Sequence, residues 1–314
     1  MTVPLKDLDH FEAARYHLGA VAYRLLGSPV DAEDAVQETY LRWAAANRDD
    51  IEVPRAWLTR VLTHHCLDQL TSARARREEY VGQWLPEPLL DGDPLLGPAE
   101  TVEQRDSVSL AMLGLLEDLA PQERAVFVLK EAFGYPHAEI AETLGTTVAG
   151  SQQAFARARR RLREGEPRAE ATPESSREVV EAFLNAAAGG DLEQLVGMLS
   201  ENAVSIADGG GKVPAARRPI IGAEKIATLL RGAFRPTPAK RNFLGGPLEL
   251  YADLVNGSPA LLASSGGRLV GVIVLERADG RIRDIRIQAN PGKLVRLEQR
   301  WRASNPGEPL SSAW

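Results

Sequence analysis

The sequence predicts a multidomain protein in which two all-α helical domains are followed by one α+β domain. Apolar residues recur at helical spacing through residues 1–80 and again through 106–165, which indicates amphipathic helices. Strand-like apolar runs begin only after residue 247. Prolines between residues 81 and 105 exclude a continuous helix there and mark a linker. A chain of 314 residues is long enough for two or three domains of ordinary size.

The composition favours a soluble globular protein, with 44% hydrophobic and 25% charged residues. The longest apolar runs, such as residues 269–275, are too short to span a bilayer, and residues 1–10 lack the pattern of a secretory signal. Cys66 is the only cysteine, so neither an internal disulfide framework nor a cysteine-rich zinc site is expected. We therefore expect a cytoplasmic protein with no membrane segment, no metal and no cofactor.

Three helices are expected within residues 1–80. The first ends at Gly27-Ser28-Pro29, where a helix cannot easily continue. Asp31 is expected to cap the second helix, whose apolar stripe reaches Trp43. Pro54 suits the first position of the third helix.

The second helical domain ends in two short helices, residues 137–144 and 148–163, which a glycine-containing turn separates. A small residue where the helices pack, Ala141, and a turn glycine, Gly145, are typical of a helix-turn-helix. The second helix is expected to pack through Val148, Phe155, Ala158 and Leu162, whereas Ser151 and Ala154 are smaller than ideal for that face.

The opposite face of residues 148–163 is polar and basic. Glutamine can pair with adenine, and arginine can pair with guanine or phosphate, so this face is a candidate DNA-reading surface. The alternative is a solvated, arginine-rich helix of a bundle. The candidate residues are Thr147, Gln152, Gln153, Arg157 and Arg160.

The C-terminal part is expected to form the α+β domain over residues 174–296, followed by a tail over 297–314. A turn at Ala278-Asp279-Gly280 predicts a hairpin. The expected helices span residues 174–188, 192–199 and 223–234, and the expected strands span 248–255, 260–264, 269–277 and 282–289.

On the helix over residues 31–43, Asp34, Gln37, Glu38 and Arg42 share one face, opposite the apolar stripe. Periodicity alone would make this an ordinary surface helix. However, residues 31–43 resemble region 2 of the extracytoplasmic-function sigma factors of the sigma-70 family, and residues 119–162 resemble region 4 of the same family.

Three further strings resemble one group of these factors, which carries a fused SnoaL-like C-terminal extension. The resemblance implies a cone-shaped, nuclear-transport-factor-like fold for that extension. In one-letter code the strings are WLPEPL at residue 84, DGGGK at residue 208 and NPGKL at residue 290.

The resemblance implies an RNA polymerase sigma factor that directs initiation at specific promoters. It implies that Asp34, Gln37, Glu38 and Arg42 dock on the β′ clamp helices of core RNA polymerase. Residues 44–53 and the helix over 55–77 would melt and read the minus-ten element, and the polar face of residues 148–163 would read the minus-thirty-five element. The candidates for the minus-ten contacts are Trp57, His64, His65, Arg74 and Arg76, with Trp57 alternatively a core residue.

The linker over residues 81–105 is acidic, and in this family such linkers thread toward the active-site channel of the polymerase. Glu87, Asp91 and Asp93 fit this role, and a solvated tether is the alternative. We expect the C-terminal domain to regulate the factor by contacting the linker, because an apolar, proline-locked segment is costly to expose. The residues expected at this contact are Trp84, Leu85, Pro86, Asp208, Gly209, Gly210, Gly211, Lys212, Asn290, Pro291 and Lys293.

SnoaL-like relatives include isomerases and cyclases that use a carboxylate base with tyrosine or histidine partners. No histidine follows His137, and Tyr251 is the only tyrosine after residue 135. Asp208, Asp253 and Asp284 therefore lack the usual proton-transfer partners, so no catalytic residue and no enzyme activity are expected. The pocket of the cone is a candidate site for an unidentified small molecule.

Two other functions fit parts of the sequence. A ligand-sensing helix-turn-helix repressor would leave the face of residues 31–43 without a role. A SnoaL-like isomerase or cyclase fused to a DNA-binding module would lack the histidines.

The net charge of −6 does not exclude DNA as a partner, because the charge is unevenly distributed. Residues 81–105 carry −4 and residues 1–80 carry −3, whereas residues 106–164 carry only −1 and residues 165–314 carry +2. We expect weak binding to free DNA and dependence on the polymerase for promoter capture.

Overall fold

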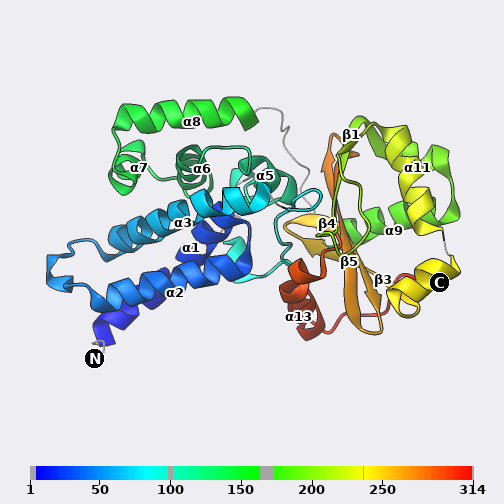
Figure 1. Cartoon of the computed structure of the whole chain (residues 1–314), viewed down its shortest axis with the longest axis horizontal. Coiled ribbons are helices and arrows are strands. Elements are labelled where there is room, and N and C mark those ends of the chain that lie inside the picture. Colours follow the sequence, from blue (N-terminus) through cyan, green and yellow to red (C-terminus); the bar gives the residue numbers. More distant parts are fainter. Residues whose placement is uncertain (1–4, 79, 98–101, 163–172, 236, 313–314) are drawn as a thin grey trace. The chain divides into compact units, whose positions relative to one another are not determined.

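The computed structural model describes residues 5–78, 80–97, 102–162, 173–235 and 237–312. It contains two compact units (Figure 1). The helical unit comprises Met1–Glu79, Gly92–Val108 and Met112–Gly165, and the sheet unit comprises Tyr80–Asp91, Ser109–Ala111 and Glu166–Trp314. The predicted fold class, helical domains followed by a domain with a mixed sheet, is confirmed.

The helical unit begins with three mutually packed helices, α1 (Leu5–Leu26), α2 (Pro29–Ala45) and α3 (Pro54–Glu78). Pro54 starts α3 as predicted. The expectation that Asp31 caps α2 is wrong. Ser28 is the N-cap and its hydroxyl accepts from the amide of Asp31, because Pro29 already occupies the first helical position.

The rest of the helical unit consists of short helices. They are η1 (Arg48–Asp50), η2 (Pro94–Leu96), α4 (Val102–Asp106), α5 (Leu110–Leu116), α6 (Pro121–Phe127), the π-turn η3 (Val128–Ala132), α7 (His137–Leu144) and α8 (Val148–Leu162). Helices α7 and α8 form the predicted pair, and Gly145 between them adopts a left-handed φ of 63°.

Two buried arginines connect α1 to α6 within the helical unit. Arg124 forms an ion pair with Glu117 at 2.9 Å and donates to the carbonyl oxygen of Arg24 at 3.1 Å. Arg24 in turn donates to the hydroxyl of Ser107 at 2.9 Å. Burial lowers the pKa of both guanidinium groups to about 9, so both remain charged at neutral pH. The two helical regions of the sequence are thus packed together in one unit.

The sheet unit is built on a six-stranded sheet in the order β2-β1-β6-β5-β4-β3. Strand β1 pairs with β6 in parallel, and the other neighbouring strands are antiparallel. The strands are β1 (Leu199–Asp208), β2 (Ile220–Ile221), β3 (Leu248–Val255), β4 (Ser258–Ser265), β5 (Arg268–Ala278) and β6 (Arg281–Gln288).

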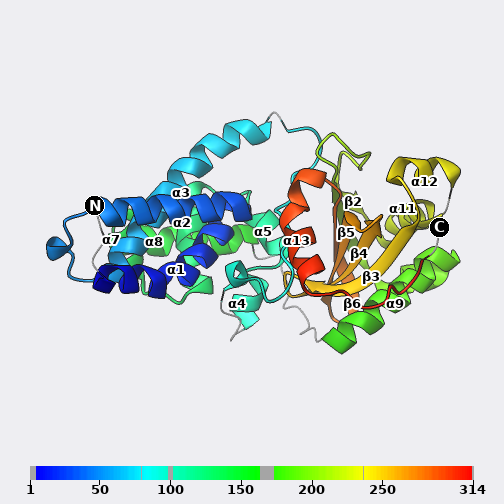
Figure 2. The ribbon, with the colours of Figure 1, turned by 90° about the horizontal axis from the view of Figure 1, so that it is seen from below.

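Helices cover both faces of this sheet (Figures 1 and 2). One face packs against α9 (Pro173–Gly189), α10 (Leu192–Met198) and α11 (Ala223–Phe234), with α12 (Pro238–Leu244) beside them. Phe183, Ile226 and Leu230 are buried in the core of this layer. On the other face lies α13 (Val295–Ala303), whose Trp301 contacts Tyr251 of β3 at 4.9 Å between ring centroids.

Five described elements of the sheet unit were not predicted: β1, β2, α12, the short 3-10 helix η4 (Pro291–Lys293) and α13. Residue 297, expected to begin a separate tail, lies inside α13, and Leu297 is fully buried. The last part of the chain also returns to the sheet, because Leu250 and Ser311 form an isolated bridge.

The segment over residues 81–105 is divided between the two units. Tyr80–Asp91 belongs to the sheet unit and Gly92–Val108 to the helical unit. As predicted, the described part of this segment contains no long helix or central strand. Among the helices that the structure describes, none is long and apolar enough to cross a membrane.

Candidate functional site

Helix α8 presents the predicted polar face to solvent. Gln152, Gln153, Arg157 and Arg160 are all exposed. Thr147 is also exposed, and its hydroxyl accepts from the amide of Gly150 at 3.0 Å, as expected of a residue that caps the helix. The structure therefore places all five predicted side chains on an accessible surface.

The buried face of α8 differs from the predicted one at Val148. Val148 is 46% exposed and does not pack as expected, whereas Ser151 is fully buried. The hydroxyl of Ser151 lies 2.9 Å from His137 Nδ1 of α7, so a hydrogen bond takes the place of aliphatic packing. Ala154, Ala158 and Leu162 complete the buried face.

Helix α6 holds the basic face of α8 in position. Glu123 of α6 is nearly buried and accepts from Arg157 at 2.7 Å and from Arg161 at 2.9 Å. Both guanidinium groups remain about half exposed, at 50% and 56%. Glu123 thus orients two arginines at the surface without removing them from solvent.

On α2, the four predicted residues share an accessible face. Asp34, Gln37 and Arg42 are exposed, and Glu38 is partly exposed and pairs with Arg42 at 2.9 Å. The opposite face of α2 is buried, with Trp43 only 1% exposed. The helix therefore has one face committed to the core and one available to a partner.

The predicted minus-ten residues lie along α3. Trp57 is partly buried and its ring lies 5.5 Å from that of Trp43, so it serves the core at least in part. His64 and His65 are partly exposed, and His65 Nε2 lies 2.9 Å from Gln69 Nε2. The side chains of Arg74 and Arg76 lie outside the described residues.

In the sheet unit, Asp208 binds the segment that precedes residue 92. It has no solvent-exposed surface, and its Oδ1 accepts from the Tyr80 hydroxyl at 2.6 Å. Its Oδ2 accepts from the Leu85 amide at 3.0 Å and from Lys293 Nζ at 2.7 Å. Burial and the bond to Asp208 raise the pKa of Tyr80. We call the cluster of Tyr80, Trp84, Leu85, Asp208 and Lys293 the linker dock.

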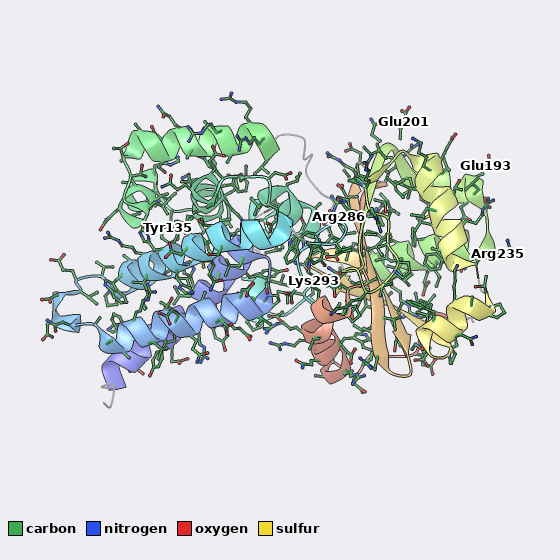
Figure 3. All side chains as sticks on the ribbon, viewed as in Figure 1. Tyr135, Glu193, Glu201, Arg235, Arg286 and Lys293 are labelled. Carbon is green, nitrogen blue, oxygen red and sulfur yellow. The ribbon has the colours of Figure 1, made fainter. Side chains whose placement is uncertain are left out.

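Lys293 provides the positive charge of the linker dock. It ends η4 (Pro291–Lys293), just before α13, and is labelled in Figure 3. Besides Asp208, its ammonium donates to the carbonyl oxygen of Leu85 at 2.7 Å. It also lies 3.2 Å from the centroid of the Trp84 ring, a close cation–π contact. Lys293 thus contacts both a backbone carbonyl and an aromatic ring of the linker.

The glycines after Asp208 allow the backbone to approach its neighbours closely. A Cβ atom on Gly210 would overlap the side chain of Asn290, and one on Gly211 would lie 3.1 Å from Val81. Asn290 itself donates to the Tyr80 hydroxyl at 2.8 Å. Residues larger than glycine would therefore separate the surfaces that form the linker dock.

The remaining predicted residues of this contact divide into two groups. Leu85 and Pro86 are buried, and a Cβ atom on Gly209 would overlap the carbonyl oxygen of Val213. Lys212 and Pro291 are exposed, so their side chains do not take part in the buried contact.

A second attachment of the linker, which the sequence did not reveal, lies at the turn between β3 and β4. Leu89 donates its amide to Asn256 Oδ1 at 2.7 Å and accepts from the amide of Asn256 at 2.9 Å. Asp91 accepts from the amide of Gly257 at 2.8 Å. Asn256 has a positive φ of 52°, a conformation that asparagine tolerates in a tight turn. The Asn256-Gly257 pair was the sequence signal for this turn.

The three carboxylates considered for catalysis have separate partners. Asp208 belongs to the linker dock, and Asp284 pairs with Arg286 at 2.9 Å. Asp253 accepts from its neighbouring amide, that of Leu254, at 2.8 Å. Among the described residues, no group of three or more metal-binding side chains is present.

Comparison with family models matches two parts of this chain. The family described as Sigma-70 region 2 matches residues 11–76, and the family described as Sigma-70, region 4 matches residues 109–162. The first match covers α1 to α3, apart from the ends of α1 and α3, and the second covers α5 to α8.

The chain is also similar to two curated proteins of Mycobacterium tuberculosis. It is 40% identical over 227 residues to ECF RNA polymerase sigma factor SigJ, covering 72% of each chain. It is 35% identical over 290 residues to Probable ECF RNA polymerase sigma factor SigI, covering 90% of this chain and 93% of that one. The crystal structure of the M. tuberculosis extracytoplasmic function sigma factor SigJ matches with a TM-score of 0.70 at 33% identity, covering 92% of this chain and 98% of that one.

Proposed function

The chain belongs to the extracytoplasmic-function sigma factors of the sigma-70 family, and we propose that its sheet unit controls its promoter activity in cis. As a sigma factor, it directs transcription initiation at specific promoters. Regions 2 and 4 imply binding to core RNA polymerase and to promoter DNA.

On the polymerase side, the exposed face of α2 contacts the β′ clamp helices. Asp34, Gln37, Glu38 and Arg42 are accessible together, and the core residues on the other side of α2 fix the orientation of this face. Charged and amide side chains on one rigid helix give a specific, electrostatically complementary contact.

On the DNA side, α8 reads the minus-thirty-five element in the major groove and α3 reads the minus-ten element. Two exposed glutamines and three exposed arginines on α8 supply base-edge and phosphate contacts: Gln152, Gln153, Arg157, Arg160 and Arg161. On α3, the partly exposed rings of Trp57, His64 and His65 are suited to stacking on unpaired bases.

The linker dock is the single observation that carries the proposal of control in cis. In this family the linker threads toward the active-site channel of the polymerase. The docked segment is bound to the sheet unit through Tyr80, Leu85, Leu89 and Asp91. Because one segment cannot occupy two places, docking competes with entry into the channel and restrains initiation.

The acidic residues of the linker support the same competition. Asp91 accepts from Gly257, and Asp93 caps η2 by accepting from the amide of Leu95 at 3.0 Å. Asp91, held by the turn between β3 and β4, cannot line the channel at the same time, whereas the cap that Asp93 forms is local and moves with its own segment. Glu87 is partly exposed.

In vitro transcription with core polymerase and the full chain, on a template library with randomised promoter elements, tests the proposal. Asp208→Asn and Lys293→Met should raise the yield of sigma-dependent transcripts, because both weaken the linker dock. Lys225→Met, at an exposed lysine of α11, is the matched control and should leave the yield unchanged.

Absence of any transcript that depends on this chain would contradict the sigma-factor function, and would be the result expected of a repressor or an enzyme. A yield that the linker-dock variants leave unchanged or lower would contradict restraint by docking.

A further inference from the structure

The sheet unit contains an apolar cavity that the proposed function does not use. Its volume is about 240 Å³, and it lies between the ends of α11 and α12 and strands β3 to β6. Leucine, isoleucine, valine and phenylalanine side chains form most of its wall. For comparison, an apolar cavity of about 150 Å³ is large enough to bind benzene. This cavity has room for one or two fused rings.

The cavity exists because two small residues face each other on the sheet. Ala263 of β4 and Gly271 of β5 are paired in register, and both line the cavity. Leu261 and Ile273, the pair two positions away on the same face, carry full-sized side chains. A Cβ atom on Gly271 would meet only the carbonyl oxygen of Gln288, at 3.6 Å. Larger side chains at this pair would therefore fit sterically and fill the space.

The ammonium of Lys240 is already hydrogen-bonded by the protein. Lys240 is the one ionisable side chain among the described residues that line the cavity. Its ammonium donates to the carbonyl oxygens of Gly232, Ala233 and Arg235 at 2.6, 2.9 and 2.9 Å, at the C-terminal end of α11. A lysine ammonium has three protons, so these bonds use all of its donors. It contributes its methylene stem to the cavity wall and keeps no donor for a ligand carboxylate.

We propose that this cavity binds a small, uncharged, predominantly apolar molecule of one or two rings, and that its occupancy strengthens docking of the linker. Burying a charged group against this apolar wall is unfavourable without a compensating partner, so acids and amines should bind more weakly than uncharged molecules of the same shape. The second half of the proposal rests on the proposed control by the linker dock.

Strand β6 connects the cavity to the linker dock. Ile287 lines the cavity, and the next residue, Gln288, is fully buried on the other face of the strand. The side chain of Gln288 donates to Asp208 at 3.4 Å and accepts from the amide of Asn290 at 3.0 Å. A ligand that orders β6 at Ile287 therefore also orders the side chain that supports Asp208, which favours the docked state.

Binding of naphthalene to the full chain, followed by ligand-observed NMR and by the shift in unfolding temperature, tests the first half. Naphthalene should bind and stabilise the protein, and 2-naphthoate, with the same rings and a carboxylate, should bind at least about tenfold more weakly. Equal or tighter binding of 2-naphthoate would overturn the ligand class.

Two variants locate the site. Ala263→Leu and Gly271→Val fill the cavity from two different strands and should each reduce naphthalene affinity at least about tenfold. Ala188→Leu, which adds the same side chain at an exposed position of α9, is the control and should bind as the unaltered chain does. Retained binding in a folded Ala263→Leu or Gly271→Val protein would overturn the assignment of the site.

Hydrogen exchange at the linker amides tests the second half. Saturating naphthalene should slow exchange at the Leu85 and Leu89 amides severalfold in the unaltered chain and should have no effect in Ala263→Leu. Unchanged exchange despite binding would overturn transmission through β6. Because this readout needs no polymerase, its failure is distinguishable from a failure of the transcription test.

Discussion

The ammonium of Lys293 and the carboxylate of Asp208 form a 2.7 Å ion pair in which both side chains are shielded from solvent. The two residues lie 85 positions apart in the chain, and both also bind the backbone of Leu85. A buried charge pair is valuable mainly because removing one partner leaves the other uncompensated. The pair therefore makes linker docking sensitive to single substitutions.

Lys293→Met should destabilise the protein by about 3 to 5 kcal/mol, because the carboxylate of Asp208 is then buried without its countercharge. Combining it with Asp208→Asn should recover part of this loss, since no buried charge remains. Urea unfolding of the two single variants and the double variant measures the coupling. Strictly additive effects would show that the ion pair does not hold the linker.

His17 makes the folding stability of the helical unit depend on pH. Burial, together with the charges of Arg55 and Arg24, lowers the pKa of His17 to about 4. Its Nε2 lies 2.9 Å from the hydroxyl of Tyr135, labelled in Figure 3. The folded state thus favours neutral His17, so this contribution to stability is present above pH 6.5 and is lost as the pH falls toward 4.

Between pH 6.5 and 4, the unfolding free energy should fall with a slope of at most about 1.4 kcal/mol per pH unit from this group. His17→Gln should remove that part of the slope. His10→Gln, at an exposed histidine of α1, is the control and should leave it in place. If the unfolding free energy of the unaltered chain and of His17→Gln depended on pH in the same way, His17 would not be the source of this slope.

Substitutions on α8 should separate base reading from phosphate binding. Gln152→Ala should relax the preference at one position of the minus-thirty-five element by about 1 to 3 kcal/mol, because a bidentate contact to a base is lost. Arg160→Ala should weaken binding across all sequences and reduce its salt dependence. Transcription from a library of minus-thirty-five variants at two salt concentrations measures both effects.

Arg177→Ala provides the control for α8, because Arg177 is an exposed arginine of α9 in the sheet unit. It should alter neither the preferred sequence nor the salt dependence. A loss of sequence preference in Arg160→Ala, with none in Gln152→Ala, would contradict the assigned roles.

Helices with strong local signals were predictable from the sequence. The bounds of α7 and α11 agree with the predicted ones, because their apolar spacing and flanking glycines act over a few residues. Strand β1 was missed because its register against β6 shifts between Leu199 and Val204, which breaks the alternation that marks a strand. Helix α13 was missed because only Leu297 and Trp301 of it are buried, too few to show a period.

The candidate site was predictable in composition but not in geometry. The exposed faces of α2 and α8 follow from helical periodicity, so the sequence sufficed to list their residues. The linker strings were recognisable as unusual local segments that resemble those of one group in the family. Tyr80, Asn256 and Gln288, however, carry no local sign that they meet Asp208 or Leu89.

The sequence by itself determined the helices, most strands and the residue types available to DNA, polymerase and linker, because these depend on interactions between near neighbours in the chain. Only the tertiary structure decided that Lys293 and Asp208 bind Leu85, and that Ala263 and Gly271 leave a cavity. Both outcomes depend on strand register and on contacts between distant segments, which local spacing does not encode.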